Sequence, residues 1–290
     1  MRKKQSRLKA LQPYKYLTPA VIFLGIVFGI PLINTAVYAF ADVNIMEGIQ
    51  KWVGFKNFTF LTDSGFWDTI KRTLIWVVCG VTGIFIYAMA VSLALNKPIP
   101  GRGFFRIVVI IPWLIPHAFA GTIWTWMLNS NSGFVNMLLM KSGIIDEPVS
   151  FFGESLAMAT VIFIRIWKGS PFLIMSLLSA FQTIPEEVEE AAKIDGAGKI
   201  RYFINILIPM IKPVLVSSGI ILTAWTITIF DIVYVLTGGG PSNATNILSI
   251  AIYKSAFIEN KLGVASAMSF VTMLVLAVIG YFQMKAQNEN

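Results

Sequence analysis

Four ionisable side chains stand inside otherwise apolar runs of the sequence: His117, Arg165, Lys168 and Asp231. An Arg, Lys or Asp side chain at the centre of a membrane helix costs about 2.5–3.5 kcal/mol, so such groups face protein or a wet cavity. At about 1.5 Å per residue, Arg165 lies about 12 Å after the start of its run and Asp231 about 8 Å before the end of its run, and these two ends lie on the same side of the membrane. They could form an ion pair with no substrate role. A second hypothesis is that Arg165, Lys168 and His117 serve an anionic solute.

Motifs for catalysis and nucleotide binding are missing from the sequence. The run Gly196-Ala197-Gly198-Lys199 suggests a phosphate-binding loop, but Ile200 stands where that motif needs Ser or Thr. His117 and Cys79 are the only histidine and the only cysteine, so no His/Cys metal cluster and no internal disulfide can form. We therefore expect no enzyme, and no metal or cofactor bound by this chain.

The composition is that of a membrane protein. The 290-residue chain is 56% hydrophobic and 13% charged, and its mean hydropathy is +0.72. In soluble domains about a quarter of the residues are charged. The net charge of +8 is spread over segments that flank apolar runs. We interpret it as a feature of membrane topology and expect no nucleic-acid binding.

Six apolar segments are long enough to cross a hydrocarbon core about 30 Å thick. They are residues 17–40, 73–95, 107–128, 157–181, 214–236 and 262–284. The first far exceeds the roughly 7–15 apolar residues of a signal peptide. The sequence thus predicts an all-α integral membrane protein with one six-helix domain, residues 17–284, between an N-terminal segment, 1–16, and a tail, 285–290.

Basic residues are distributed unequally between the two sides of this topology. The side that holds both termini and the loop 183–213 carries 14 Lys and Arg residues, and the opposite side carries seven. By the positive-inside rule, both termini and this loop are predicted to be cytoplasmic.

The loop 183–213 is polar and carries helix signals of its own. Thr183, followed by Glu186, fits a capping box, and Asp195-Gly196 predicts the end of a short helix. Within it, Ala191 and Ala192 share a face that another protein could approach closely. A second segment from Lys199 carries an apolar stripe suited to the membrane surface and is expected to stop at the prolines 209 and 213.

The spacing within this loop resembles the EAA loop of the membrane subunits of bacterial ABC importers. Glu190-Ala191-Ala192 is followed after three residues by Gly196, and after nine more by Ile206 and then Pro209. Ile208 stands where the family usually has Leu. The resemblance implies a type I ABC importer permease fold whose cytoplasmic coupling helix docks on the ATPase subunit. The implied coupling residues are Glu190, Ala191, Ala192, Asp195, Gly196, Ile206 and Pro209. The alternative is an ordinary solvated helical hairpin.

Three further stretches resemble the sugar pathway of maltose-type permeases. The first is Pro112–His117, whose two prolines should bend the helix. The second is Trp167–Phe172, and the third precedes the loop Thr237–Pro241 (TGGGP), which in that family marks the subunit pairing with a different permease. The implied pathway residues are Trp113, His117, Lys168, Gly169, Phe172, Trp225, Thr226 and Ile229, the last replacing an amide. Aromatic faces stack on sugar rings, although each Trp could instead only pack between helices.

The resemblance implies a multi-pass permease subunit of the bacterial cell membrane that translocates a carbohydrate: a mono- or oligosaccharide, or a related solute such as glycerol phosphate. The implied partners are a second, homologous permease subunit, a cytoplasmic ABC ATPase dimer that uses ATP and Mg, an extracytoplasmic solute-binding protein and the lipid bilayer. The alternative is a secondary transporter or channel for a small polar solute, working without an ATPase. That class predicts inverted repeats and a discontinuous helix with ion-coordinating groups.

Overall fold

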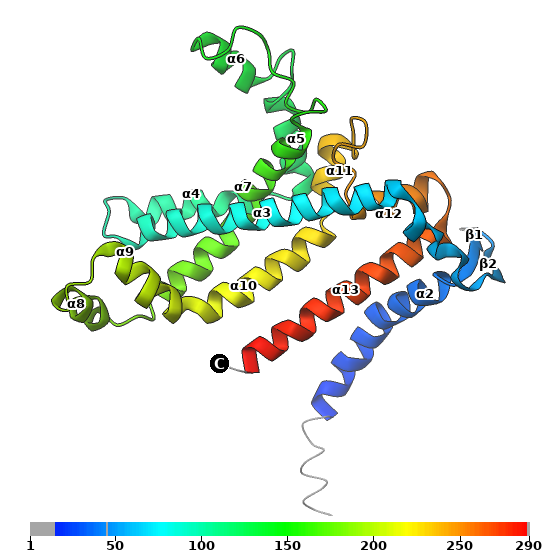
Figure 1. Ribbon diagram of the computed structural model, residues 1–290, viewed down its shortest axis with the longest axis horizontal. Coiled ribbons are helices and arrows are strands. Elements are labelled where there is room, and N and C mark those ends of the chain that lie inside the picture. Colours follow the sequence, from blue (N-terminus) through cyan, green and yellow to red (C-terminus); the bar gives the residue numbers. More distant parts are fainter. Residues whose placement is uncertain (1–14, 45, 289–290) are drawn as a thin grey trace, which may run out of the picture. The chain divides into compact units, whose positions relative to one another are not determined.

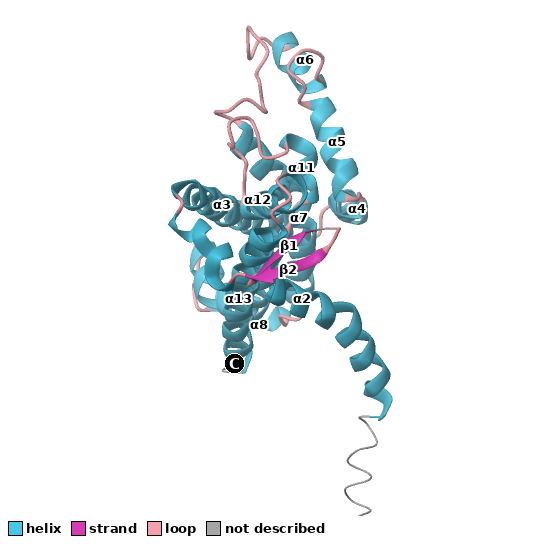
Figure 2. Ribbon diagram, turned by 90° about the vertical axis from the view of Figure 1, so that its right-hand side faces the viewer, coloured by secondary structure: helices cyan, strands magenta, loops and turns pink. Residues whose placement is uncertain are grey.

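The computed structural model describes residues 15–44 and 46–288, which are mostly helical (Figures 1 and 2). They fall into two compact units. The first holds the described residues up to Asp63 together with Ile252–Leu274, and the second holds Ser64–Ala251 with the residues from Val275 on. Most of the predicted N-terminal segment, residues 1–14, lies outside the described residues, as do residues 289 and 290 of the predicted tail.

The first unit contains a long apolar helix, a small β-hairpin and a 3-10 helix. The helix covers Lys15–Tyr38 and includes a π turn, η1 (Gly25–Gly29), and α2 (Ile30–Tyr38). Strands β1 (Ala41–Asn44) and β2 (Gly48–Trp52) pair antiparallel, and η2 (Gly54–Thr62) follows. The unit also holds η4 (Lys254–Ile258) and the first part of α13 (Leu262–Asn288).

Asn57 ties the end of α2 to the hairpin. Its side-chain amide donates to the carbonyls of Tyr38, Ala39 and Ala41 at 3.4, 3.1 and 2.8 Å. Gly263 lies directly beside this amide, because a Cβ there would come within 2.6 Å of both Asn57 Nδ2 and the Ala41 carbonyl oxygen. A single side chain therefore satisfies the carbonyls of the turn that leads into β1.

The second unit is built around α7. Its elements are α3 (Ser64–Asn96), α4 (Arg102–Leu114), α5 (His117–Met127), α6 (Phe134–Lys141), α7 (Ala157–Phe181), α8 (Glu186–Ile194), α9 (Lys199–Tyr202), the π turn η3 (Phe203–Leu207), α10 (Ile208–Thr228), α11 (Asp231–Thr237) and most of α12 (Leu248–Tyr253). In α7, 61% of the most apolar window is buried, against 22% in α3 and in the helix Lys199–Thr228. Helix α7 therefore forms the centre, packed against α3, α4 and α10 (Figure 1).

The candidate membrane spans number five or six, against the six that were predicted. Five described helices are long and apolar enough: Lys15–Tyr38, Ser64–Asn96, Ala157–Phe181, Lys199–Thr228 and Leu262–Phe282. A sixth span arises if the pair Arg102–Leu114 and His117–Met127 is counted as one broken helix, bent by 100°. The predicted segment 107–128 is thus two helices, and the predicted bend at its prolines is confirmed.

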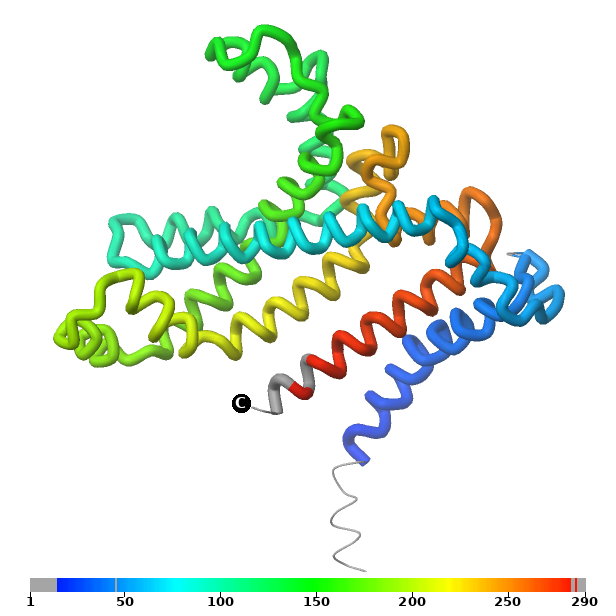
Figure 3. The backbone as a smooth tube through the Cα atoms, viewed as in Figure 1, coloured from blue at the N-terminus to red at the C-terminus, as the bar shows by residue number. Residues whose placement is uncertain are grey.

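The fifth predicted segment, 214–236, differs from the structure at both ends. The helix begins at Lys199, passes through Pro209 and Pro213, and ends at Thr228 (Figure 3). The predicted stop at the two prolines is wrong. An interior proline costs about 3 kcal/mol, but Pro209 follows the π turn η3, where the regular hydrogen-bond ladder is already interrupted. Burial of Leu207 and Ile211, at about 1.5–3 kcal/mol each, offsets much of the remaining cost.

The loop Thr237–Pro241 folds around Thr245. Gly238 and Gly239 adopt φ angles of 57° and 89°, and the Gly240-Pro241 bond is cis. The fully buried Thr245 hydroxyl lies 2.6 Å from that of Thr237 and donates to the Gly240 carbonyl at 3.1 Å. These contacts give the glycine-rich segment one defined conformation.

Candidate functional site

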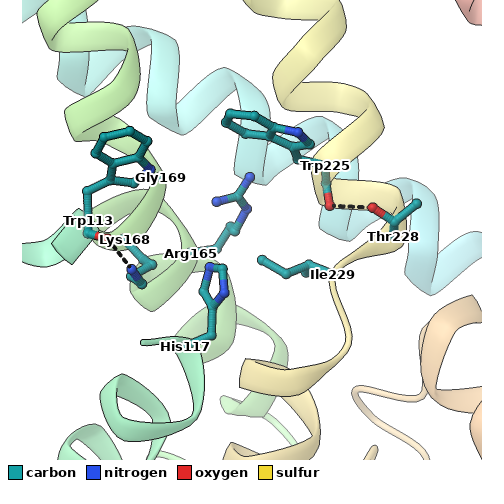
Figure 4. A pocket seen from close by; sticks show the side chains of 8 residues that line it. All are labelled: Trp113, His117, Arg165, Lys168, Gly169, Trp225, Thr228 and Ile229. Carbon is teal, nitrogen blue, oxygen red and sulfur yellow. Dashed lines mark hydrogen bonds between the residues drawn. The ribbon is translucent and has the colours of Figure 1, made fainter. Parts of the chain in front are cut away.

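A cavity of about 400 Å³ opens in the second unit where two helices are broken (Figure 4). It is lined by Trp113, His117, Arg165, Lys168, Gly169, Trp225, Thr228 and Ile229. These residues come from the end of α4, the start of α5, the middle of α7 and the end of α10. The volume lies in the range of about 300–1,000 Å³ that is usual for small-molecule sites.

Both helix breaks have a clear backbone cause. Pro116 has no N–H to continue α4, and Ile115 adopts an extended ψ of 127°, so α5 restarts at His117. Ile229 is likewise extended, with ψ of 128°, and α11 restarts at Asp231. Each break leaves backbone carbonyls without helical partners at the cavity wall. Irregular backbone at membrane depth is tolerated where it lines such a cavity.

The two restarted helices, α5 and α11, pack closely against one another. A Cβ on Gly121 would lie 2.9 Å from Val235 Cγ1, so glycine is what permits this approach. At their first residues, His117 Nδ1 lies 3.2 Å from Asp231 Oδ2, with both side chains partly exposed. The two short helices therefore behave as one packed pair beside the cavity.

Arg165 is held inside the second unit by a hydroxyl group. It is only 3% exposed, and its Nη2 and Nε donate to Thr226 Oγ1 at 2.9 and 3.3 Å. Thr226 Oγ1 in turn donates to the Leu222 carbonyl at 2.6 Å. A Cβ on Gly169 would lie 2.7 Å from Ile84 Cδ1 and 2.5 Å from Arg165 Nη1, so this glycine makes room for the guanidinium between α7 and α3.

Lys168 lies one helical turn after Arg165 and is also only 3% exposed. Its Nζ donates to the Trp113 carbonyl at 3.2 Å. That carbonyl would pair with His117 in an unbroken helix, and the break at Pro116 frees it. Lys168 thus satisfies the end of α4, a position that favours a cation.

The ion pair predicted between Arg165 and Asp231 is not formed. Asp231 contacts His117 instead, and its second oxygen accepts from the Ile232 backbone N–H at 3.0 Å. The prediction assumed a straight fifth helix, and the break at Ile229 turns the carboxylate away. Among the described residues, no carboxylate lies within ion-pair distance of Arg165 or Lys168.

Six of the eight predicted pathway residues line the cavity: Trp113, His117, Lys168, Gly169, Trp225 and Ile229. The other two support it from behind. Phe172 packs edge to face on Trp225, with ring centroids 5.0 Å apart. Thr226 is fully buried; its hydroxyl accepts from Arg165, and its carbonyl accepts from Trp76 Nε1 at 2.8 Å.

Thr228 lines the cavity but was not predicted, and Arg165, which entered the pathway only in the hypothesis of an anionic solute, lines it as well. The signal for Thr228 is its spacing, three residues after Trp225 on the same helix face. The signal for Arg165 is its position one turn before Lys168.

The predicted short helix in the loop 183–213 exists as α8, and it ends where expected. Gly196 adopts φ of 74°, its N–H bonds the Lys193 carbonyl, and the Ala197 N–H bonds the Ala192 carbonyl, which together make a Schellman motif. The predicted capping box is wrong. The Thr183 hydroxyl donates backwards to the Ala180 carbonyl at 2.8 Å, at the end of α7, so it is not available to α8.

The predicted coupling residues do not share one exposed surface. Ala192 is 4% exposed and packs into the chain itself, whereas Ala191 faces solvent, so the expected face of two small residues is wrong. Glu190, Asp195, Gly196 and Pro209 are exposed, and Ile206 is half-buried. On the same helix, Glu189 and Lys193 pair at 2.8 Å, and this hydrogen bond raises the pKa of Lys193.

Residues 86–289 match the family described as "Binding-protein-dependent transport system inner membrane component". The sulfoquinovosyl glycerol transport system permease protein SmoG of Agrobacterium fabrum is 33% identical over 268 residues, covering 90% of this chain and 87% of the relative. The trehalose/maltose transport system permease protein MalF of Thermococcus litoralis is 33% identical over 229 residues, covering 78% and 77%.

A solved structure with the same fold is that of a bacterial alginate ABC transporter in complex with alginate pentasaccharide-bound periplasmic protein. One of its chains superposes with a TM-score of 0.83 at 23% identity, covering 98% of this chain and 96% of that chain.

Proposed function

Since this chain belongs to the family of binding-protein-dependent transport system inner membrane components, we propose that it is a permease subunit that carries a carbohydrate through the cavity at its two helix breaks. The cavity with two indole side chains carries this proposal. Trp113 and Trp225 are 52% and 44% exposed, which leaves their surfaces available for a sugar ring. The names of the two relatives, each a transport permease for a sugar or sugar derivative, support the same class of solute.

The chain itself performs no chemical step in this proposal. ATP and Mg are used by a separate cytoplasmic ABC ATPase dimer, which docks on α8 and the following segment. The Schellman motif at Gly196 fixes the end of α8, so a movement of the docked subunit is passed on and not absorbed by a frayed helix end. Both chain termini and α8 lie on the cytoplasmic side of the bacterial cell membrane, as the distribution of basic residues favours.

The remaining partners follow from the same proposal. A second, homologous permease subunit completes the pathway, and an extracytoplasmic binding protein delivers the solute. The ordered loop Thr237–Pro241, braced by Thr245, is the segment that we assign to contact on the extracytoplasmic side. The solute is a mono- or oligosaccharide or a related polar molecule such as glycerol phosphate.

The rival function is a secondary transporter that works without an ATPase. The breaks at Pro116 and Ile229 meet one of its requirements, a discontinuous helix. The family match over residues 86–289 favours the ATP-driven importer. The two functions differ in what drives uptake, which can be measured directly.

The test uses the complete complex purified through a tag on this chain. We expect an ABC ATPase subunit to co-purify, and Glu190→Lys or Gly196→Pro to remove it. Glu147→Lys, an exposed charge change in the loop between α6 and α7, is the matched control and should retain it. Uptake of a labelled sugar into proteoliposomes should require ATP on the side of the membrane that the ATPase subunits face. Uptake driven by an ion gradient alone, with no ATPase bound, would refute the proposal.

A further inference from the structure

Two buried cations line the cavity without a carboxylate to balance them. Arg165 and Lys168 are each 3% exposed, and their hydrogen-bond acceptors are neutral: the Thr226 hydroxyl and the Trp113 carbonyl. Buried charges in proteins are normally paired. Ionisable groups at membrane depth face the bundle interior or a water-filled cavity and mark substrate or ion pathways.

The nearby carboxylate forms no ion pair with either cation. Asp231 is not among the residues that line the cavity, and its two oxygens are engaged by His117 and by the Ile232 backbone N–H. The described part of the cavity wall therefore carries two fixed positive charges and no acidic side chain. Such a wall favours an anion and disfavours a cation.

Both cations also have unused hydrogen-bond donors. An ammonium group offers three donors and a guanidinium five. Lys168 makes one hydrogen bond in the structure, and Arg165 makes two, both to the same oxygen. Because residues 165 and 168 lie one turn apart on the same face of α7, both side chains line one cavity (Figure 4).

We propose that the transported solute carries an acidic group, a carboxylate, sulfonate or phosphate ester on a carbohydrate, which Lys168 and Arg165 bind in the cavity. The sugar ring then lies against Trp113 and Trp225, the second of which is held in place by Phe172. This inference rests on the proposed function, because it specifies the solute of the same cavity. It adds that a neutral sugar of the same size is a poor substrate.

The first experiment compares matched solutes in proteoliposomes that contain the complete importer, with its binding protein added. The pairs are digalacturonate with galactobiose, glucose 6-phosphate with glucose, and glucose 6-sulfonate with glucose. We expect ATP-dependent uptake of the acidic member of at least one pair, with the neutral member at least tenfold weaker in kcat/KM. Equal or better uptake of the neutral members overturns the inference and leaves the proposed function standing. ATP-independent uptake, or no ATP-dependent uptake of any probe, removes both.

The second experiment tests the assignment of the charge to Lys168. Lys168→Met should raise KM for the transported acid about tenfold or more, the effect of losing one charge-assisted hydrogen bond, with a smaller change in kcat. Lys168→Arg should restore most of the loss, and Lys71→Met, an exposed lysine outside the cavity, is the matched control. If Lys168→Met instead releases the second permease subunit and leaves KM unchanged, a carboxylate of that subunit neutralises the site and the inference is wrong.

Discussion

Replacing Thr226 by valine tests whether the Thr226 hydroxyl holds Arg165 in place. Valine matches threonine in shape and removes only the hydroxyl, which accepts both hydrogen bonds of the buried Arg165. A hydrogen bond to a charged group contributes about 1.5–3 kcal/mol, and both Arg165 hydrogen bonds to this hydroxyl are buried. We therefore expect Thr226→Val to lower the free energy of unfolding by about 1.5–3 kcal/mol.

The assay is equilibrium unfolding of the purified chain in mixed micelles with increasing SDS, followed by circular dichroism. Thr223→Val is the matched control on the same helix, because its hydroxyl bonds only the Gly219 carbonyl of the preceding turn. It should change the unfolding free energy by less than about 0.5 kcal/mol. Thr226→Ser, which keeps the hydroxyl, should recover most of the loss. Equal stability of Thr226→Val and Thr223→Val would show that the hydroxyl does not hold the arginine.

Three further substitutions test contacts elsewhere in the chain. Gly121→Ala should destabilise the packed pair α5 and α11 by about 1–3 kcal/mol through overpacking, measured by SDS unfolding. Adding Val235→Ala should restore part of this stability. No rescue would contradict the contact between Gly121 and Val235. Gly196 adopts a positive φ, so Gly196→Val should destabilise the end of α8 by about 1–2 kcal/mol and weaken retention of the ATPase subunit. Gly196→Asn should be tolerated. Equal retention of the ATPase subunit by the two variants would contradict the role of the Schellman motif. Asn57→Ala should speed amide hydrogen exchange in β1 and cost about 1–3 kcal/mol, whereas the exposed Gln50→Ala should have no effect.

Hydropathy and turn chemistry were sufficient to predict much of the fold. The apolar runs predict the number of spans because a helix that crosses a bilayer needs about 20 apolar residues regardless of its neighbours. The end of α8 at Asp195-Gly196 could be predicted because only glycine enters the left-handed region at little cost. Both signals are local in the chain.

The sequence-based predictions are wrong where a side chain has more than one possible partner in the folded chain. The sequence shows that Arg165 and Asp231 have similar depths, but it does not show that the chain breaks at Ile229 and turns the carboxylate toward His117. The Thr183 hydroxyl was predicted to cap the start of α8, but it donates to the Ala180 carbonyl at the end of α7. Propensity cannot decide such competition, because the outcome depends on the direction of each helix.

The helix Lys199–Thr228 joins the two regions that the proposed function connects. It contains the predicted coupling residues Ile206 and Pro209 in its first half and ends with Trp225 and Thr228 in the cavity wall. At about 1.5 Å per residue its 30 residues span about 45 Å. The π turn η3 and the two prolines lie in the first half of this helix, and residues 214–225 form regular α-helix. Under the proposed function, an axial displacement of Val214 therefore moves the indole of Trp225 by a similar amount. Under the same proposal, solute release depends on how far α10 shifts along α7, against which it packs.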